Sequence, residues 1–171
     1  MIEGAREFRR GKAGPLAKLG GRFQFNTSMF ELLTDDIDRD EWMKLSGRGN
    51  SAHWILGHLC TMRLSLLRTL GVEQPDMVWE PQFAVGGDAS PFGGQYPEPQ
   101  DLLLCFHGTG EKLIRALEST TPMSAQAKWN EGDFELPVTV EDCVGFFYFD
   151  ETFHLGQLGL ARQQLGKPRV I

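Results

Sequence analysis

The chain has 171 residues, enough for one domain with a sizeable hydrophobic core. Hydrophobic residues make up 41% of the chain and charged residues 23%, as in soluble globular proteins. The formal net charge of −6 argues against a nucleic-acid-binding protein, which needs a basic surface to neutralise phosphates.

The three cysteines, Cys60, Cys105 and Cys143, are odd in number and far apart in the sequence, and no CxxC pair is present. They therefore predict small buried side chains in a reducing cytoplasm and not a disulfide framework. No apolar run approaches the roughly 20 residues that a membrane helix needs, and no secretory leader pattern is visible. We expect a cytoplasmic protein without membrane or nucleic-acid partners.

The first 20 residues are rich in glycine, arginine and lysine and have no clear hydrophobic period. We interpret 1–20 as a flexible arm, a remnant of expression or an over-extended start, with a functional basic arm as the less favoured alternative. The folded domain is expected to span 21–171.

The first helix is predicted over 23–37, with an inner face formed by Phe25, Met29, Leu32 and Leu33 at helical spacing. An acidic stretch then leads to a glycine-rich connection.

The second helix is predicted over 51–70, between a cap at Asn50 or Ser51 and a stop at Gly71. His58 borders its apolar stripe and is expected to face inward. His53 lies five residues earlier, about 140° around the helix, and is expected to be exposed. The stripe consists of Ile55, Leu59, Met62 and Leu66.

A long connection follows over 72–97, with four glycines and four prolines. Connections longer than about 12–15 residues are uncommon in compact domains and often form binding loops or lids. A short pair of strands within this connection is also compatible with the sequence. So is an insertion that only packs over one end of the domain.

The third helix is predicted to begin near Pro99 and to end at the Thr120-Thr121-Pro122 run, with a bend where Gly108 and Gly110 weaken it. Its inner face is expected to be Leu103, Phe106, Leu113, Ile114 and Leu117.

The fourth helix is predicted to begin at Thr139, with Asp142 completing a weak capping box, and to end at Gly166. Its predicted inward stripe is Phe147, Asp150, His154, Leu158, Ala161 and Leu165. Four such helices without a strand pattern predict an all-α fold, an antiparallel four-helix bundle with a long loop between the second and third helices.

Asp150 and His154 lie four residues apart, a spacing that stacks two side chains on one helix face. A carboxylate and an imidazole so placed are ligands for a divalent metal, and His58 would be a third. Taken alone, the pair is equally typical of a buried hydrogen bond, because a buried carboxylate needs a partner. His107 is a reserve candidate without a second ligand beside it.

Two runs carry a resemblance to a known family. Asn50 to Leu59 (NSAHWILGHL) resembles the second helix of the DinB/YfiT-like proteins, and Phe153 to Arg162 (FHLGQLGLAR) resembles their fourth helix, with its His-x-Gly-Gln signature. The runs lie about a hundred residues apart, as in the family, and the shared layout covers 23–167. Together the two motifs are fairly specific.

The resemblance implies a four-helix bundle, often a homodimer, with a divalent metal held by three side chains that are usually histidines. The ligands would be His58, Asp150 and His154, so an aspartate stands where the family usually has its middle histidine. A two-histidine, one-carboxylate set suits zinc, nickel, iron or manganese, and the carboxylate shifts preference toward harder metals. The same change is compatible with a member that has lost tight metal binding.

Characterised relatives include thiol-dependent enzymes, so the resemblance implies a metal-dependent transferase that joins a low-molecular-weight thiol to a small electrophile. Gln157, one turn beyond His154, is expected to orient a ligand or substrate, in a pocket beneath the long connection. One alternative is a metal-dependent hydrolase, which lacks an evident general base because Glu151 points about 100° away from Asp150. The other is a non-enzymatic dimeric bundle in which the three residues form a hydrogen-bonded network.

Overall fold

The structure is a computed structural model that describes residues 14–44, 49–84, 96–128 and 139–170. Four long helices and two short ones account for the regular structure of this part of the chain, which contains no strand. The elements are α1 (Ala17–Thr34), α2 (Ala52–Thr69), the 3₁₀ turn η1 (Glu80–Phe83), α3 (Pro99–Ser119), the one-turn α4 (Pro122–Ala125) and α5 (Val140–Gln164). The prediction of an all-α four-helix bundle is confirmed.

The predicted helix ends are confirmed where cap residues specify them. The Ser51 side chain accepts a hydrogen bond from the backbone N–H of Trp54, and Thr139 accepts one from Asp142, so both helices begin where expected. Gly71 and Gly166 follow α2 and α5 with φ of 78° and 79°, a left-handed conformation that favours glycine. None of the described helices is long and apolar enough to cross a membrane.

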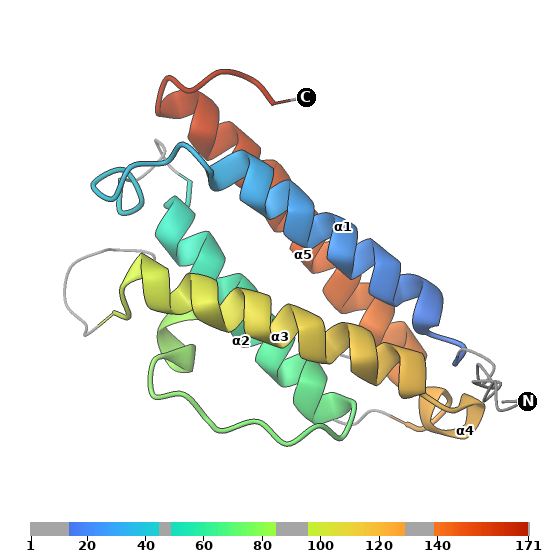
Figure 1. The fold of residues 1–171 in the computed structure, drawn as a ribbon. Coiled ribbons are helices and arrows are strands. Elements are labelled where there is room, and N and C mark those ends of the chain that lie inside the picture. The colour runs from blue at the N-terminus through green and yellow to red at the C-terminus, as the bar shows by residue number, and fades with distance from the viewer. Residues whose placement is uncertain (1–13, 45–48, 85–95, 129–138, 171) are drawn as a thin grey trace, which may run out of the picture.

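The bundle contains two antiparallel and two parallel pairs of neighbouring helices, as Figure 1 shows. α1 is antiparallel to α3, and α2 is antiparallel to α5. α1 runs parallel to α5, because Phe23 contacts Tyr148 near the start of both helices and Leu33 contacts Arg162 near their ends. α2 likewise runs parallel to α3.

This topology explains the long connection between α2 and α3. Since the two helices run in the same direction, the chain must return along the whole of α2, whose 18 residues span about 27 Å. The described part of this connection (72–97), which we call the crossover, packs along α2. There the Arg68 guanidinium donates to both carboxylate oxygens of Glu80 at 2.8 Å. The crossover is therefore a structural requirement of the bundle. The possible strand pair falls partly on 85–95, outside the described residues.

The interior consists of two hydrophobic clusters with a polar layer between them. One cluster gathers around Phe30, Leu59 and Phe106, and the other around Phe23 and Leu113. Between them lie buried polar side chains from all four long helices: Asn26 and Thr27, Arg63, Thr109, and Glu151. A polar layer at mid-height restricts how the helices can slide past one another.

Arg63 is the centre of this layer and is only 1% exposed. Its guanidinium donates to both carboxylate oxygens of Glu151, at 2.9 and 2.8 Å, to the carbonyl of Phe106 and to the hydroxyl of Thr27. A single side chain of α2 thus bonds all three other long helices. The same residue explains Gly110, because a Cβ there would lie 2.7 Å from Arg63 Nη1. α3 continues through this glycine without a break.

Two predictions about which side chains face inward are wrong. Phe25 and Leu32 were expected in the core, but they are 64% and 46% exposed, and α1 instead buries Phe23, Phe30 and Leu33. The physical reason is that α1 carries apolar residues on two faces, and periodicity alone does not choose between them. α1 also spans 17–34, six residues earlier at its start than the predicted helix. Residues 1–13 of the expected arm lie outside the described residues.

Candidate metal centre

The three predicted ligands meet between α2 and α5, beside the polar layer. His58, Asp150 and His154 each offer one ligand atom, and these atoms all lie within 4.8 Å of one another. His58 Nε2 is 3.3 Å from Asp150 Oδ2, and His154 Nε2 is 3.7 Å from Asp150 Oδ1. Both histidines are buried, whereas the Asp150 side chain is 17% exposed. The site therefore lies just below the surface of the bundle.

The crossover fixes the orientation of His58. The Nδ1 of His58 lies 2.7 Å from the carbonyl oxygen of Phe83, the last residue of η1. A carbonyl only accepts hydrogen bonds, so Nδ1 is the donor, and in the neutral tautomer that fits this contact the lone pair of Nε2 faces Asp150. A backbone carbonyl on the other ring nitrogen is the usual companion of a metal-binding histidine.

Gly57 makes this contact possible. A Cβ at position 57 would lie 2.4 Å from the ring of Phe83, so any larger residue would push the ring off α2. Gly57, beside His58 in the Gly-His-Leu run, thus leaves room for the ring of Phe83, and the backbone carbonyl of Phe83 orients the histidine. The sequence shows the glycine but not its function.

His154 has an equivalent partner on its own helix. Its Nδ1 lies 3.0 Å from Gln157 Oε1, one turn further along α5, so Nδ1–H donates a hydrogen bond to the amide oxygen and Nε2 again faces Asp150. Burial lowers the pKa of His154, and nearby His58 lowers it further. Both effects disfavour the protonated imidazole and so favour the neutral form that can act as a ligand.

The resulting arrangement places three acceptors around one point. A neutral imidazole nitrogen and a carboxylate oxygen repel one another at these distances unless a cation or a proton lies between them. A proton on His58 would satisfy one contact, but a divalent cation would satisfy all three. The donor set, with two imidazoles and one carboxylate, suits zinc or a harder first-row metal.

Trp54 forms one wall of the site. Its indole stacks on the His58 ring with the planes 7° apart and the centroids 5.0 Å apart, and it also contacts the His154 ring. This contact restricts rotation of the His58 ring and shields it from water. The aromatic wall and the hydrogen bonds at Nδ1 together hold the histidines in one geometry.

The remaining histidines do not join this cluster. His53 was expected to be exposed and is instead buried, because the end of the crossover covers the start of α2 and places the carbonyl of Pro97 2.8 Å from His53 Nε2. Burial lowers the pKa of His53. His107 is 42% exposed and lies 3.5 Å from Glu31, away from the three ligands.

Glu151, the one carboxylate considered as a general base, is bound to Arg63 and only 3% exposed. Sequence reasoning missed this ion pair because Arg63 and Glu151 lie 88 residues apart on different helices. A buried arginine on an otherwise apolar helix face was the available signal, since such a charge requires a partner. Among the cysteines, Cys60 and Cys143 are buried as predicted, and burial raises the pKa of the Cys60 thiol.

The expected pocket beneath the crossover falls partly on 85–95, outside the described residues. In the described part, Phe83 covers His58 from this side.

A family profile described as the DinB superfamily matches residues 22–158. No curated protein matches the chain.

Proposed function

Because the chain belongs to the DinB superfamily and gathers three metal-ligating side chains, we propose that it is a metal-dependent enzyme that transfers a low-molecular-weight thiol to a small electrophile. The observation that carries the proposal is the convergence of His58 Nε2, His154 Nε2 and the Asp150 carboxylate on one point. Three protein ligands leave a coordination position for a substrate.

A divalent metal in this site would lower the pKa of a bound thiol, so that the thiolate forms at neutral pH. The chain's own residues have separate tasks. Phe83 and Gln157 hold the two histidines with Nε2 directed inward, and Trp54 keeps water from one side of His58. Gln157 was expected to touch substrate. We propose instead that it positions His154, because its amide oxygen is 3.0 Å from the imidazole.

The hydrolase alternative needs a base to deprotonate the attacking water. The carboxylate nearest in sequence, Glu151, accepts two hydrogen bonds from Arg63 and is buried, so it does not serve that purpose. The non-enzymatic alternative needs a proton at the position that we assign to a metal. It predicts a folded protein that binds no divalent cation with high affinity.

The test begins with protein purified without an immobilised-nickel step or chelators, in which metal content is measured by mass spectrometry. We expect bound metal in the wild type and its loss in His58→Ala, Asp150→Ala and His154→Ala. His107→Ala is the matched control, because this histidine lies outside the cluster. Wild-type protein that neither contains nor takes up zinc, nickel, iron or manganese would contradict the proposal.

The thiol-transfer step is tested with a panel of small thiols and an aryl chloride as the electrophile. The thiol sulfur forms a thioether with the ring carbon, the carbon–chlorine bond breaks, and chloride and a proton are released. We expect thioether formation that requires the metal and all three ligands. If the protein hydrolyses esters or phosphates and forms no thioether with any of these thiols, the hydrolase is favoured instead.

We also propose that the protein works in the cytoplasm as a homodimer. The three cysteines are free, as a reducing compartment would keep them. Fractionation of expressing cells tests the location, with recovery in the extracellular or membrane fraction as the contrary result.

A further inference from the structure

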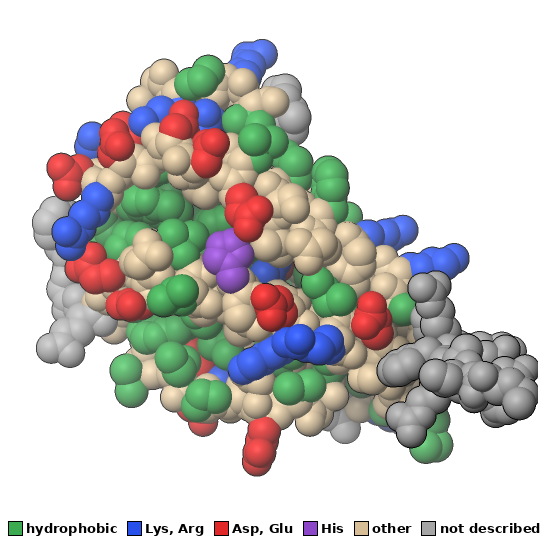
Figure 2. All heavy atoms as spheres, viewed as in Figure 1, with side chains coloured by type: hydrophobic (Ala, Val, Ile, Leu, Met, Phe, Trp, Pro, Cys, Tyr) green, Lys and Arg blue, Asp and Glu red, His purple; other side chains and the backbone are tan. Residues whose placement is uncertain are grey.

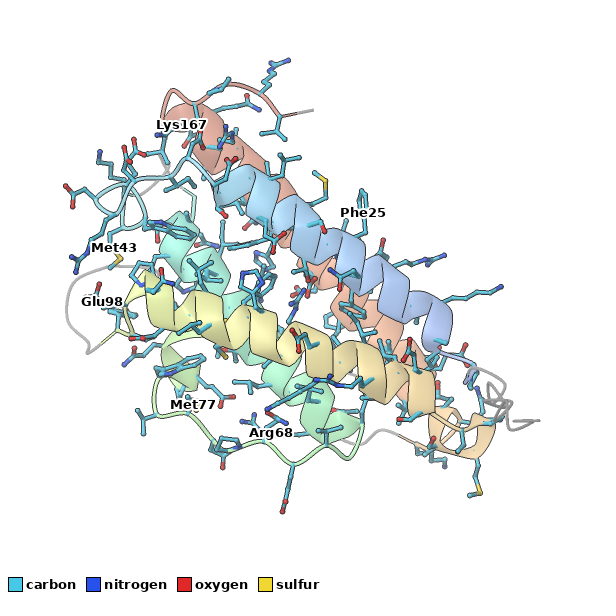
Figure 3. All side chains as sticks on the ribbon, viewed as in Figure 1. Phe25, Met43, Arg68, Met77, Glu98 and Lys167 are labelled. Carbon is cyan, nitrogen blue, oxygen red and sulfur yellow. The ribbon has the colours of Figure 1, made fainter. Side chains whose placement is uncertain are left out.

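A groove of about 450 Å³ lies between α1 and α5, whereas the candidate metal centre lies between α2 and α5. Figure 2 shows hydrophobic side chains gathered along the edge of the bundle that α1 forms, and Figure 3 shows Phe25, which borders the groove, pointing away from the bundle. The volume lies within the range of about 300–1,000 Å³ that is usual for small-molecule sites. The three candidate metal ligands do not line this groove.

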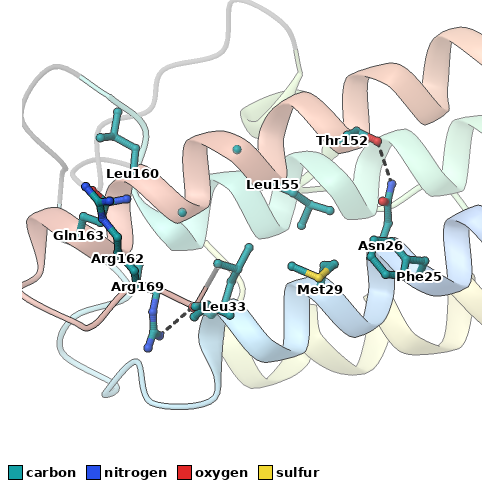
Figure 4. A pocket seen from close by; sticks show the side chains of 13 residues that line it. Phe25, Asn26, Met29, Leu33, Thr152, Leu155, Leu160, Arg162, Gln163 and Arg169 are labelled. Carbon is teal, nitrogen blue, oxygen red and sulfur yellow. Dashed lines mark hydrogen bonds between the residues drawn. The ribbon is translucent and has the colours of Figure 1, made fainter.

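Two glycines of α5 keep the groove open. Gly156 and Gly159 line it, and neither places a side chain between the helices. An added Cβ at Gly156 would meet nothing within 4 Å, and one at Gly159 would reach Leu33 at 3.9 Å. On the side of α1, Figure 4 shows the thioether of Met29 and the ring of Phe25. A flat wall opposite a thioether and an aromatic ring suits a planar apolar group.

The middle of α1 places a buried polar group in this groove. Asn26 lines the groove but is only 2% exposed, and its Nδ2 donates to Thr152 Oγ1 at 3.2 Å. Thr152 Oγ1 donates its own proton to the Tyr148 carbonyl, so the group of Asn26 that faces it is the N–H. In the part of the chain that the structure describes, no donor reaches the Asn26 amide oxygen. A ligand hydroxyl in the groove would satisfy this acceptor.

The other end of the groove is cationic. Its charged lining residues are Arg162 and Arg169, and no acidic side chain of the described residues lines it. Arg162 already donates to both carboxylate oxygens of Asp36. Arg169 is exposed, and no carboxylate within the described ranges pairs with it. A guanidinium binds a carboxylate in bidentate geometry, so Arg169 is available to an anionic group at this end.

The spacing of the two polar ends limits the size of the ligand. Asn26 and Leu33 lie seven residues apart on α1, about 10 Å along the helix axis. The arginine end lies at Leu33, because Arg162 Nη1 donates to the Leu33 carbonyl. A para-hydroxyphenyl ring with a short carboxylate chain has a comparable length. It also has a hydroxyl donor at one end, a planar apolar middle and an anion at the other end, in the order that the groove requires.

We propose that the α1/α5 groove binds a para-hydroxyaryl carboxylate of the size of para-hydroxyphenylpropionate. The hydroxyl donates to the Asn26 amide oxygen, the ring lies between Met29 and the wall formed by Gly156 and Gly159, and the carboxylate pairs with Arg169. The site goes beyond the proposed thiol chemistry, and it stands whether or not the three ligands on the other side of α5 bind a metal.

Isothermal titration calorimetry with the full chain tests the proposal, using three related probes. We expect saturable binding of para-hydroxyphenylpropionate with a Kd of about 1 mM or tighter. Phenylpropionate lacks the hydroxyl and should bind about 10-fold more weakly, because the Asn26 oxygen stays unpaired. Tyramine carries an ammonium group in place of the carboxylate and should not bind, because it would meet Arg169 with like charge.

Two glycine variants test the location of the site. Gly156→Leu should abolish binding, because the new side chain fills the groove, and the fold should stay intact since the added Cβ meets open space. Gly145→Leu is the matched control, because Gly145 is also an exposed glycine of α5 with open space around an added Cβ, yet it does not line the groove. It should bind para-hydroxyphenylpropionate as the wild type does.

Two polar variants test the two ends separately. Asn26→Leu should remove the roughly 10-fold preference for para-hydroxyphenylpropionate over phenylpropionate, and a purely structural role of Asn26 would not change that ratio. Circular dichroism checks that this variant is folded. Arg169→Gln should weaken binding of both acids about 10-fold and leave the preference for the hydroxyl unchanged.

The proposal would be overturned if the wild type bound none of the acids saturably, or bound both with equal affinity. Retained binding in Gly156→Leu, or equal loss in Gly145→Leu, would place the ligand elsewhere and overturn it too. Sedimentation velocity adds one more outcome: if Gly156→Leu dissociates a dimer and leaves acid binding unchanged, a second copy occupies the groove and the proposal is wrong. The titrations are repeated after treatment with a chelator, so a failure here is distinguishable from a failure of the proposed function.

Discussion

Replacing Arg63 by methionine should cost more stability than any comparable surface substitution. Methionine retains much of the side-chain volume but removes a charge that is 1% exposed and that pairs with a carboxylate 3% exposed. Glu151 would be left buried without a counter-charge, and the carbonyl of Phe106 and the hydroxyl of Thr27 would each lose a donor. Removal of one partner of a buried ion pair costs about 3–5 kcal/mol of the free energy of unfolding.

For a chain of this size that loss corresponds to a fall of about 6–20 °C in the unfolding midpoint. Urea unfolding followed by circular dichroism measures the change, with an unaltered m-value confirming that the native state is still compact. Arg115→Met is the matched control, because Arg115 pairs with Glu111 on the surface of α3, and it should have no measurable effect.

The double variant Arg63→Met/Glu151→Leu sharpens this test. It removes both charges together, so no unpaired ion remains, and it should be clearly more stable than the sum of the two single losses implies. A loss below about 1 kcal/mol for Arg63→Met, or simple additivity of the two single variants, would refute the reasoning. Either result would mean that Arg63 does not hold the four helices together as the contacts indicate.

Three further outcomes are expected. Gly57→Ala should displace the Phe83 ring, which would lie 2.4 Å from the added Cβ. It should lower the free energy of unfolding by about 1–3 kcal/mol, measured in urea, and should lower metal affinity through His58. The control Gly108→Ala has open space around the added Cβ and should slightly stabilise the protein. Gln157→Leu should lower metal affinity about 10–100-fold in a chelator competition while the unfolding midpoint changes little; unchanged affinity would show that the amide does not position His154. The pKa values of His53 and His154 lie below their ordinary value of 6.5, so the unfolded chain binds protons more tightly and the free energy of unfolding of the metal-free protein should fall as the pH drops below about 6.5. His53→Phe should reduce that pH dependence, and a slope equal to that of the wild type would contradict it.

Much of the fold was predictable because its signals are local. Ser51 and Thr139 begin their helices through bonds to a backbone N–H three residues away, and Gly71 and Gly166 end them through their own backbone conformation. Such contacts form within one turn of the chain, so they can be read without knowing what packs against them. The four-residue spacing of Asp150 and His154 is local in the same sense, which is why the pair could be proposed as half of a metal site.

The remaining features depend on partners that are distant in the sequence. Sequence resemblance identified His58 as a candidate ligand, but only the structure shows which of its ring nitrogens faces Asp150. His58 Nδ1 donates a hydrogen bond to the backbone carbonyl of Phe83, 25 residues away, and this leaves Nε2 toward the site. The burial of His53 depends on Pro97, 44 residues away. Neither partner could be recognised in the sequence, because every residue type supplies a backbone carbonyl.

The sequence by itself therefore determined four helices, most of their ends and the candidate ligand pair, all through patterns within one or two helical turns. Only the tertiary structure decided which apolar face of α1 enters the core, because a helix with two such faces can pack on either one. It also decided that α2 and α3 run parallel, and that Arg63 and Glu151 form a buried pair. The buried face of α1, the direction of α3 and the Arg63–Glu151 pair depend on the free energy of packing all four helices together, which the sequence of one segment does not reveal.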